Sequence, residues 1–259
     1  MERTKQGEFN WLDISAKDLE AQSAFYVALF GWVGYDVPLG DGQIYRMFYK
    51  DDHRVAGMSQ LAPDLIAAGA PSAWNTYLAT DDVDATVAKA VELGAAVAMP
   101  PMEVTGSGRM AAIQDPTGAF VFFWKPEAAE ESIVYSQPGT LAWNDLNTRE
   151  PDAARAFHSA LVGWEFAQRE EADGAAPYWG IRAGGQAEGG MMPMPDMVPA
   201  AVPSFWMPYF GSTDVAADVA KAVDLGADVL APPTEVMGTV SFAVLTDPMG
   251  ATFALMQQL

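Results

Sequence analysis

The stretch AFYVALFGW at residues 24–32 returns as AFHSALVGW at residues 156–164, which is 132 positions further along the chain. The same displacement, with no gap, superposes other segments of matching sequence: Trp11–Asp13 on Trp143–Asp145, Trp74 on Trp206, and Asp115–Gly118 on Asp247–Gly250. Roughly a third of the aligned positions are identical, which is too many for chance. The sequence therefore predicts two homologous domains fused head to tail.

The composition is that of a folded, acidic protein. The chain has 259 residues, 50% of them hydrophobic, and this is enough apolar material for two cores of ordinary domain size, about 100 to 150 residues each. Its 34 acidic and 14 basic residues give a net charge of −20. This charge repels DNA, RNA and anionic membrane surfaces. We therefore expect neither nucleic acid nor a membrane among its partners.

The sequence contains no cysteine, which excludes disulfides, thiolate nucleophiles and cysteine metal sites. The first eleven residues, MERTKQGEFNW, contain no apolar run. No segment approaches the roughly 20 apolar residues of a membrane span. We expect a soluble, cytoplasmic protein.

Hydrophobic periodicity outlines a first module. Phe9–Ser15 alternates like a strand, and Asp18–Phe30 carries apolar residues at helical spacing and stops at Gly31. Three candidate strands follow, at Val33–Val37, Tyr45–Tyr49 and Val55–Leu61. The order of elements in this module is βαβββ.

The same order returns after Ala62–Ala73, a segment with prolines and a glycine that is predicted to be a linker. The second set of elements is a strand at Trp74–Thr80, a helix at Val83–Leu93, and strands at Ala96–Met99, Met110–Gln114 and Ala119–Trp124. An acidic, proline-flanked seam comes next. We predict an α+β fold of four βαβββ modules in two tandem domains, residues 1–126 and 140–259, joined by a linker at 127–139.

Several short motifs carry a resemblance to a known family. They are Asp18-Leu19, Ala24-Phe25-Tyr26, Leu29-Phe30-Gly31-Trp32, Asp82-Val83-Asp84-Ala85 and Asp115-Pro116-Thr117-Gly118-Ala119. With them the chain resembles the vicinal oxygen chelate superfamily, which includes glyoxalase, bleomycin-resistance and extradiol-dioxygenase proteins. It is most similar to bacterial two-domain glyoxalase-like proteins, some of which are labelled hydroxylases. The resemblance implies that each pair of modules forms a cupped sheet around a small-molecule site, with the helices outside.

Metal-dependent members of that family bind a divalent ion with His, Gln or Glu on the first and last strands of each module, because nitrogen and oxygen lone pairs coordinate such ions. The matching positions here are Trp11, Asn75, Trp143 and Met207 on first strands and Gly57, Phe122, Gly189 and Ala254 on last strands. Only Asn75 offers an oxygen ligand, and a slip of a residue or two near Gly189 would add Glu188. Neither His53, in a charged turn, nor His158, on a helix, completes a site. We expect no metal and no cofactor, and therefore neither glyoxalase I nor dioxygenase activity.

Large apolar and aromatic side chains occupy the place of the metal ligands. Because side chains alternate on a strand, Trp11, Asp13 and Ser15 share one face, and the resemblance places that face on the cavity. Methionines crowd the second domain, and they suit a large, flat, hydrophobic guest. The expected ligand-binding residues are Trp11, Asn75, Tyr77, Arg109, Phe122, Trp124, Trp143, Met207, Tyr209 and Met256. Alternatively, these aromatic and methionine side chains only fill the cup.

Asp13 and Asp145 are the clearest polar signal. Each follows a tryptophan by two residues on a strand that should open onto the cavity. An aspartate buried among aromatic rings is a plausible general base, and we predict both residues to be catalytic. The alternative is that both carboxylates bond to neighbouring backbone or hydroxyl groups. Arg109 has Ser241 as its partner in the repeat, so the two cavities are not expected to be equivalent.

Two functions from different classes follow. The first is metal-independent acid/base rearrangement of a hydrophobic, aromatic, polyketide-like metabolite, such as cyclisation, spiroketal formation, epimerisation or dehydration. The second is non-catalytic sequestration of a small hydrophobic metabolite, with a role in resistance or stress. Two states of association are compatible with the sequence: a monomer in which the modules of one domain face those of the other as a pseudo-dimer, and a homodimer.

Overall fold

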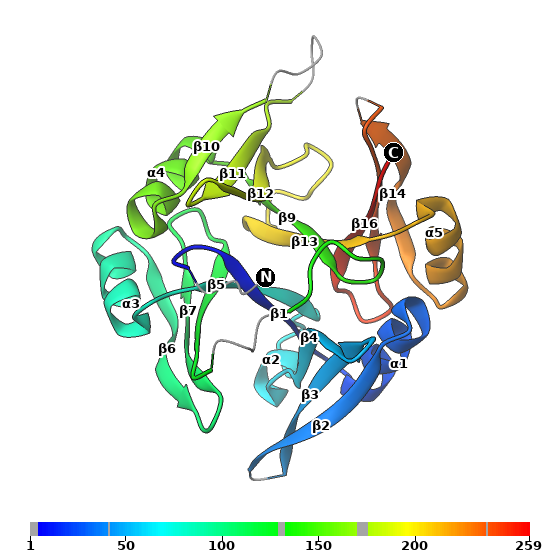
Figure 1. The fold of residues 1–259 in the computed structure, drawn as a ribbon, viewed down its shortest axis with the longest axis horizontal. Helices are drawn as coiled ribbons and strands as arrows, with labels where there is room; N and C mark the ends of the chain where they lie inside the picture. The colour runs from blue at the N-terminus through cyan, green and yellow to red at the C-terminus, as the bar shows by residue number, and fades with distance from the viewer. Residues whose placement is uncertain (1–4, 41, 129–132, 170–175, 237) are drawn as a thin grey trace. The chain divides into compact units, whose positions relative to one another are not determined.

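The computed structural model describes residues 5–40, 42–128, 133–169, 176–236 and 238–259. Four βαβββ modules follow one another along the chain (Figure 1). The first comprises β1 (Phe9–Ala16), α1 (Leu19–Phe30), β2 (Val33–Gly40), β3 (Gln43–Lys50) and β4 (His53–Gln60). The second comprises β5 (Ala73–Ala79), α3 (Val83–Glu92), β6 (Ala96–Val104), β7 (Gly108–Gln114) and β8 (Phe120–Pro126).

The second half repeats this order. Its first module comprises β9 (Leu141–Thr148), α4 (Pro151–Val162), β10 (Glu165–Gln168), β11 (Trp179–Ala183) and β12 (Gln186–Pro193). Its second comprises β13 (Phe205–Gly211), α5 (Val215–Asp224), β14 (Asp228–Val236), β15 (Val240–Thr246) and β16 (Thr252–Gln258). The predicted α+β fold of four modules in two tandem domains is therefore confirmed. Among the described residues, no helix is both long enough and apolar enough to cross a membrane.

The segment predicted to be a linker, Ala62–Ala73, differs from the expectation because it contains a short helix, α2 (Pro63–Ala67). Pro63 stands in the first turn, where its missing N–H costs no hydrogen bond, and Asp64 is a favourable acidic residue there. Pro63 therefore starts a helix in a segment that was predicted to be a linker.

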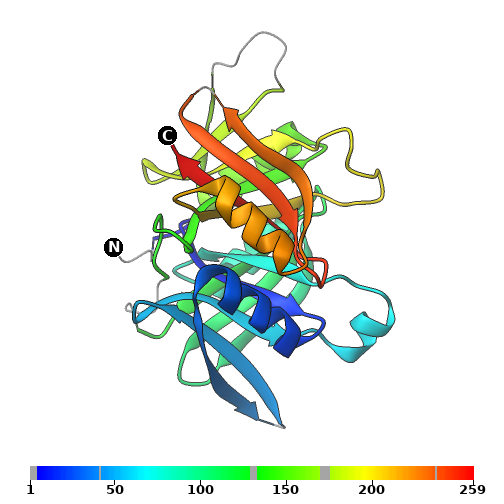
Figure 2. The same ribbon diagram turned by 90° about the vertical axis from the view of Figure 1, so that its right-hand side faces the viewer.

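Each domain contributes one eight-stranded sheet. The strand order is β2-β3-β4-β1-β5-β8-β7-β6 in the first sheet and β10-β11-β12-β9-β13-β16-β15-β14 in the second. The first and last strands of a module run parallel, as β1 and β4 do, and the other pairs within the module are antiparallel. Helix α5 crosses one face of the β14–β16 strands (Figure 2).

The parallel pairing corrects the ungapped alignment of the two halves. Asp13 lies opposite Gly57, whereas Asp145 lies opposite Gly190 and not opposite Gly189. The second domain thus has one extra residue between α4 and β11, and matching residues of the two halves are 133 positions apart there. At Trp74 and Trp206 the separation is again 132. The last-strand position assigned to Gly189 by sequence was therefore wrong by one residue.

The chain forms two compact units, and each combines parts of both tandem domains. Unit 1 contains the described residues of 1–11, 75–132 and 143–206. Here the Phe9 ring lies 5.6 Å from Trp164 and 5.4 Å from Trp206, and Trp164 Nε1 donates to Gly7 O at 2.8 Å. Residues at the start of the chain therefore pack against Trp164 of the third module and Trp206 of the fourth.

Unit 2 contains residues 12–74, 133–142 and 207–259. Its core is aromatic, with Phe30 of α1 packed at 4.9 Å against Phe210 of β13 and Tyr26 at 5.7 Å from Phe253 of β16. Trp32 Nε1 donates to Gly139 O at 2.8 Å. The first helix of the chain is thus buried against the strands of the last module.

The two DPxG turns anchor these helices. In unit 1, Asp115 Oδ1 accepts from Thr117 N at 2.8 Å and Ala119 N at 3.0 Å, while its Oδ2 lies 3.2 Å from Nε2 of the fully buried His158. One carboxylate oxygen of Asp115 therefore closes the turn, and the other binds His158 of α4, a helix of another module.

In unit 2 the second DPxG turn binds its helix in the same way, with Tyr26 in the place of His158. Tyr26 donates from its hydroxyl to Asp247 Oδ2 at 2.8 Å and accepts from Trp74 Nε1 at 3.0 Å. Because His158 cannot replace that hydroxyl, Trp206 Nε1 and His158 Nδ1 have no hydrogen-bond partner among the described residues.

Candidate functional site

In the first domain, Asp13 forms a pair with a tyrosine that the sequence analysis did not single out. Asp13 is buried on β1, and the half-buried Tyr45 on β3 donates its phenolic hydrogen to Asp13 Oδ2 at 3.0 Å. The phenol reaches the carboxylate by passing over Gly57 of β4, where a Cβ would lie 1.8 Å from the Tyr45 oxygen. Any residue other than glycine at position 57 would displace the tyrosine.

The second domain repeats this arrangement around Asp145, which is also buried. Tyr178 donates to Asp145 Oδ1 at 2.8 Å, and a Cβ on Gly190 would lie 1.8 Å from the Tyr178 oxygen. Trp143 adds a third group, since its Nε1 lies 2.9 Å from Asp145 Oδ1 and 2.8 Å from the Tyr178 oxygen. Both domains thus place a carboxylate, a phenol and a glycine together.

The environment keeps the Tyr178 phenol protonated. Burial raises its pKa above the ordinary value for tyrosine, and the negative charge and hydrogen bond of Asp145 raise that pKa further. Trp143 and Arg169 act in the opposite direction but do not cancel these effects. A protonated phenol beside a carboxylate is a hydrogen-bond donor that orients the base.

Two predicted ligand-binding residues, Tyr77 and Phe122, lie together in unit 1. Tyr77 of β5 pairs with Phe122 of β8, and their rings are 4.8 Å apart. Trp124 follows on the same face of β8 and pairs with Met110. Asn75 precedes Tyr77 on the same face of β5 and is half-buried, and Trp11 of β1 is buried.

The predicted residues of the fourth module lie together in unit 2. Tyr209 pairs with Ala254, and its ring is 6.1 Å from Phe242. Met256 is the register partner of Phe242 and is half-buried, while Met207 is buried on β13. This face is apolar, and Asp13 and Asp145 have no acidic counterpart among these residues.

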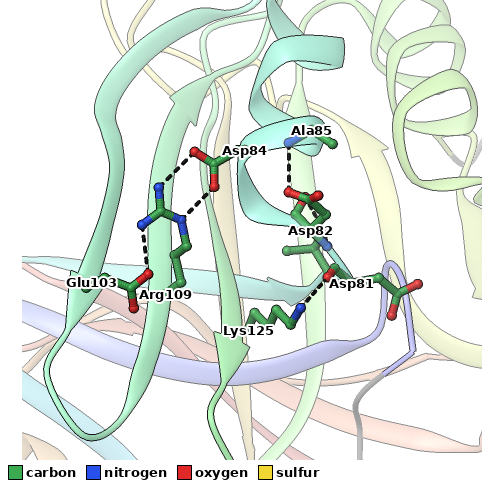
Figure 3. Close-up of polar contacts among 8 residues, drawn as sticks. Asp81, Asp82, Asp84, Ala85, Glu103, Arg109 and Lys125 are labelled. Atoms are coloured by element: carbon green, nitrogen blue, oxygen red, sulfur yellow. Dashed lines mark hydrogen bonds and ion pairs between the residues drawn. The ribbon is translucent and has the colours of Figure 1, made fainter.

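Arg109 is engaged in a surface network (Figure 3). Its guanidinium binds Asp84 of α3 through two contacts, at 2.6 and 2.8 Å, and Glu103 of β6 at 2.9 Å. Asp84 and Glu103 are largely exposed. These contacts tie the β6–β7 hairpin to the first turn of α3. The role of Arg109 as a ligand-binding residue stays a prediction.

The side chains do not fit the divalent-ion site of the metal-dependent relatives. Asp145 lies opposite Gly190, Tyr77 opposite Phe122 and Tyr209 opposite Ala254, so the last strands supply no ligand at these positions. Glu188 is buried, and its Oε2 accepts from Phe9 N at 3.1 Å. No group of three or more His, Cys, Asp or Glu side chains suited to a metal ion occurs within the described part of the chain.

The tyrosines were missed because they are not related by the 132-residue displacement. Tyr45 corresponds in structure to Tyr178, which is 133 positions later, and the ungapped alignment places Pro177 there. The available signal was the pair of glycines on the fourth strands, since a small residue beside a predicted catalytic aspartate indicates close approach of another group.

Comparisons with known proteins identify the family. The model of the glyoxalase/bleomycin resistance protein/dioxygenase superfamily matches residues 8–123, and the model of a glyoxalase-like domain matches residues 144–256. The chain belongs to this superfamily, as the motifs of the first domain indicated.

Two relatives match along nearly the whole chain. A Mycobacterium bovis protein provisionally named glyoxylase CFP32 is 41% identical over 98% of this chain and 95% of its own length. The anthracycline biosynthesis protein DnrV of Streptomyces peucetius is 32% identical over 99% of this chain and 95% of its own length. Among solved structures, a mutant of 4-hydroxymandelate synthase from Streptomyces coelicolor shares the fold, with a TM-score of 0.65 and 14% identity over 98% of this chain and 93% of that one.

Proposed function

We propose that this protein rearranges an aromatic, polyketide-like ketone by acid/base chemistry, with Asp13 and Asp145 as general bases. The observation that carries the proposal is the repeated pairing of a buried aspartate with a tyrosine over a glycine. The similarity to an anthracycline biosynthesis protein supports a polycyclic aromatic substrate.

The chemistry that the two sites support is proton transfer next to a carbonyl group. The carboxylate takes a proton from a C–H bond beside a ketone, and the electron pair of that bond forms the enolate. Return of the proton to the other face gives epimerisation. Alternatively, the protonated aspartate gives its proton to a β-hydroxyl group as that group leaves the enolate, which releases water and gives dehydration. No oxidant or reductant is consumed. A general base placed in this way contributes about 10²- to 10⁴-fold to the rate.

The phenols and aromatic side chains have separate roles in this proposal. Tyr45 and Tyr178 orient the carboxylates by donating hydrogen bonds to them. Flat side chains such as the Tyr77 and Phe122 pair stack on the rings of the substrate and restrict it to one reactive conformer.

The test is exchange of α-hydrogens for deuterium in 2-tetralone, a small aromatic ketone, followed by NMR in deuterated buffer. The protein should accelerate exchange above the buffer rate, and the double variant Asp13→Asn, Asp145→Asn should reduce exchange to that rate. Asp196→Asn, which removes an exposed carboxylate from a loop, is the matched control. Exchange at the wild-type rate in the double variant would show that neither aspartate is the base.

Native mass spectrometry of the freshly purified protein tests for sequestration without turnover. Recovery of an organic adduct unchanged after long incubation, with undiminished binding in both Asp variants and no exchange activity, would favour a binding protein over an enzyme.

A further inference from the structure

The two aspartate sites differ in the cross-strand neighbour of the tyrosine. In the first domain, Val37 of β2 is the register partner of Tyr45. In the second domain, the corresponding neighbour of Tyr178 is Arg169, whose backbone N donates to Tyr178 O at 2.9 Å. The cross-strand neighbour of the aspartate-bound tyrosine is therefore apolar in one site and cationic in the other.

Arg169 is held in place by two aromatic rings of the Asp145 site. Its guanidinium carbon lies 4.9 Å from the Tyr178 ring centroid and 5.9 Å from that of Trp143. Both rings also bond through their polar groups to each other and to Asp145. A guanidinium stacked on a ring directs its N–H groups outward from the edge of the stack, where a planar anion can accept them.

Arg169 differs from other arginines of the chain because it forms no ion pair with a carboxylate among the residues that the structure describes. Arg46 binds Glu20 and Asp36, and Arg109 binds Asp84 and Glu103, in ordinary ion pairs. The ion pairs recorded among the described residues do not include Arg169. An oriented cation that forms no ion pair with a described acidic residue is suited to recognise an anionic ligand.

The equivalent surface in the first domain is apolar. One face of β2 carries Val33, Tyr35 and Val37, because residues two positions apart on a strand point to the same side. Their exposed fractions are 52%, 61% and 44%. That face also carries Tyr45 and Tyr49, since these are the register partners of Val37 and Val33. The first site is thus bordered by neutral, partly aromatic surface.

We propose that Arg169 makes the Asp145 site selective for an aromatic ligand with an acidic group, a carboxylate or an ionised phenol, whereas the Asp13 site takes a neutral aromatic ligand. The proposal rests on the proposed function for the location of the sites, and it adds their substrate classes. Arg169 acts as a specificity-determining residue through a planar, two-point contact with the anion. Its charge also compensates the second negative charge brought close to Asp145.

The experiment compares two probes that differ by one charge, anthraquinone-2-carboxylate and anthraquinone-2-carboxamide. Their dissociation constants are measured by isothermal titration calorimetry at pH 7.5 in low salt. We expect the wild-type protein to bind the carboxylate about tenfold more tightly at one site. Arg169→Gln should abolish that preference, and Arg169→Lys should restore part of it because it keeps the charge without the planar fork.

Arg182→Gln is the matched control. Arg182 is an exposed arginine on the next strand whose guanidinium donates to Gly185 O, so its removal changes the net charge equally. It should leave the preference unchanged. Val37→Arg should introduce a carboxylate preference at the first site, which tests the same rule by gain of function.

Equal affinity of the wild-type protein for the two probes, absence of saturable carboxylate binding, or an unchanged preference in Arg169→Gln would overturn the inference. These binding measurements need no turnover, so they are independent of the exchange assay. Loss of exchange in the Asp variants with an unchanged preference in Arg169→Gln would support the proposed function alone. The reverse pattern would leave the anion site standing without the catalytic role.

Discussion

Gly57 and Gly190 explain how a tyrosine reaches a buried aspartate twice in this chain. A parallel strand places each glycine directly beside its aspartate, so the missing side chain leaves room for the phenol. A residue with a Cβ at either of these two positions would occupy the place of the phenol oxygen.

Gly190→Ala should therefore displace Tyr178 and break its bond to Asp145. We expect a loss of about 1–3 kcal/mol in the free energy of unfolding, typical of overpacking, together with slower α-hydrogen exchange. Gly180→Ala on the neighbouring strand is the matched control, because its Cβ would meet only Ala167 O at 3.8 Å. Chemical denaturation measures the stability of both variants, and equal stability would contradict this account of the site.

Tyr178→Phe should slow exchange at the Asp145 site only in part, because Asp145 keeps a hydrogen bond from Trp143 Nε1 and its carboxylate stays oriented. Replacing Trp143 by Phe as well removes this second donor and should slow exchange further. The measurement is α-hydrogen exchange in a background where Asp13 is Asn. Equal rates in the single and double variants would show that Trp143 does not support Asp145.

At the scale of secondary structure elements, the DPxG turns join strands of one module to a helix of another. Burial alone would raise the pKa of Asp115, but the hydrogen bond and charge of His158, with help from Thr117 and the Ala119 N–H, bring that pKa below its ordinary value. A depressed carboxyl pKa means that the native state is stabilised by the ionised form.

Asp115→Asn should cost about 3 kcal/mol of stability near neutral pH, as expected when one partner of a buried pair is removed. The contribution of Asp115 is fully present above the ordinary carboxyl pKa of about 4 and is lost as the pH falls through its lower value in the folded protein. The stability difference between wild type and variant should therefore shrink towards acid pH, in urea unfolding measured from pH 7 to pH 3. Asp196→Asn serves as the exposed control, and a difference independent of pH would exclude an ionised Asp115.

At the scale of the whole molecule, the compact units do not coincide with the two halves of the repeat. Phe25, Tyr26 and Phe30 of α1 are buried, with ring contacts to Phe210 or Phe253 of the fourth module. A fragment of residues 1–126 lacks those partners and exposes this apolar face.

We expect residues 1–126 alone to aggregate or to self-associate, because burial of three large aromatic side chains is worth roughly 1.5–3 kcal/mol each. Analytical ultracentrifugation of the fragment and of the full chain measures this. Co-expression with residues 127–259 should restore a soluble heterodimer. A monomeric, cooperatively folded fragment would show that the first half does not depend on the second.

The sequence by itself determined the elements of the four modules and their order, because local periodicity and helix signals act over a few residues. Asp18 caps α1 by accepting from Ala21 N, and the strand and helix of each module lie where the alternation of apolar residues predicts. It also placed Trp143 and Asp145 on one face, since residues two positions apart on a strand point to the same side.

Only the tertiary structure decided which distant groups meet. A one-residue difference between the halves conceals the match of Tyr45 with Tyr178, and strand pairing places Gly57 and Gly190 beneath their phenols. The stacking of Arg169 and the burial of α1 against the fourth module depend likewise on contacts between segments far apart in the chain. Such contacts follow from register and packing in three dimensions, which the periodicity of a single segment does not encode.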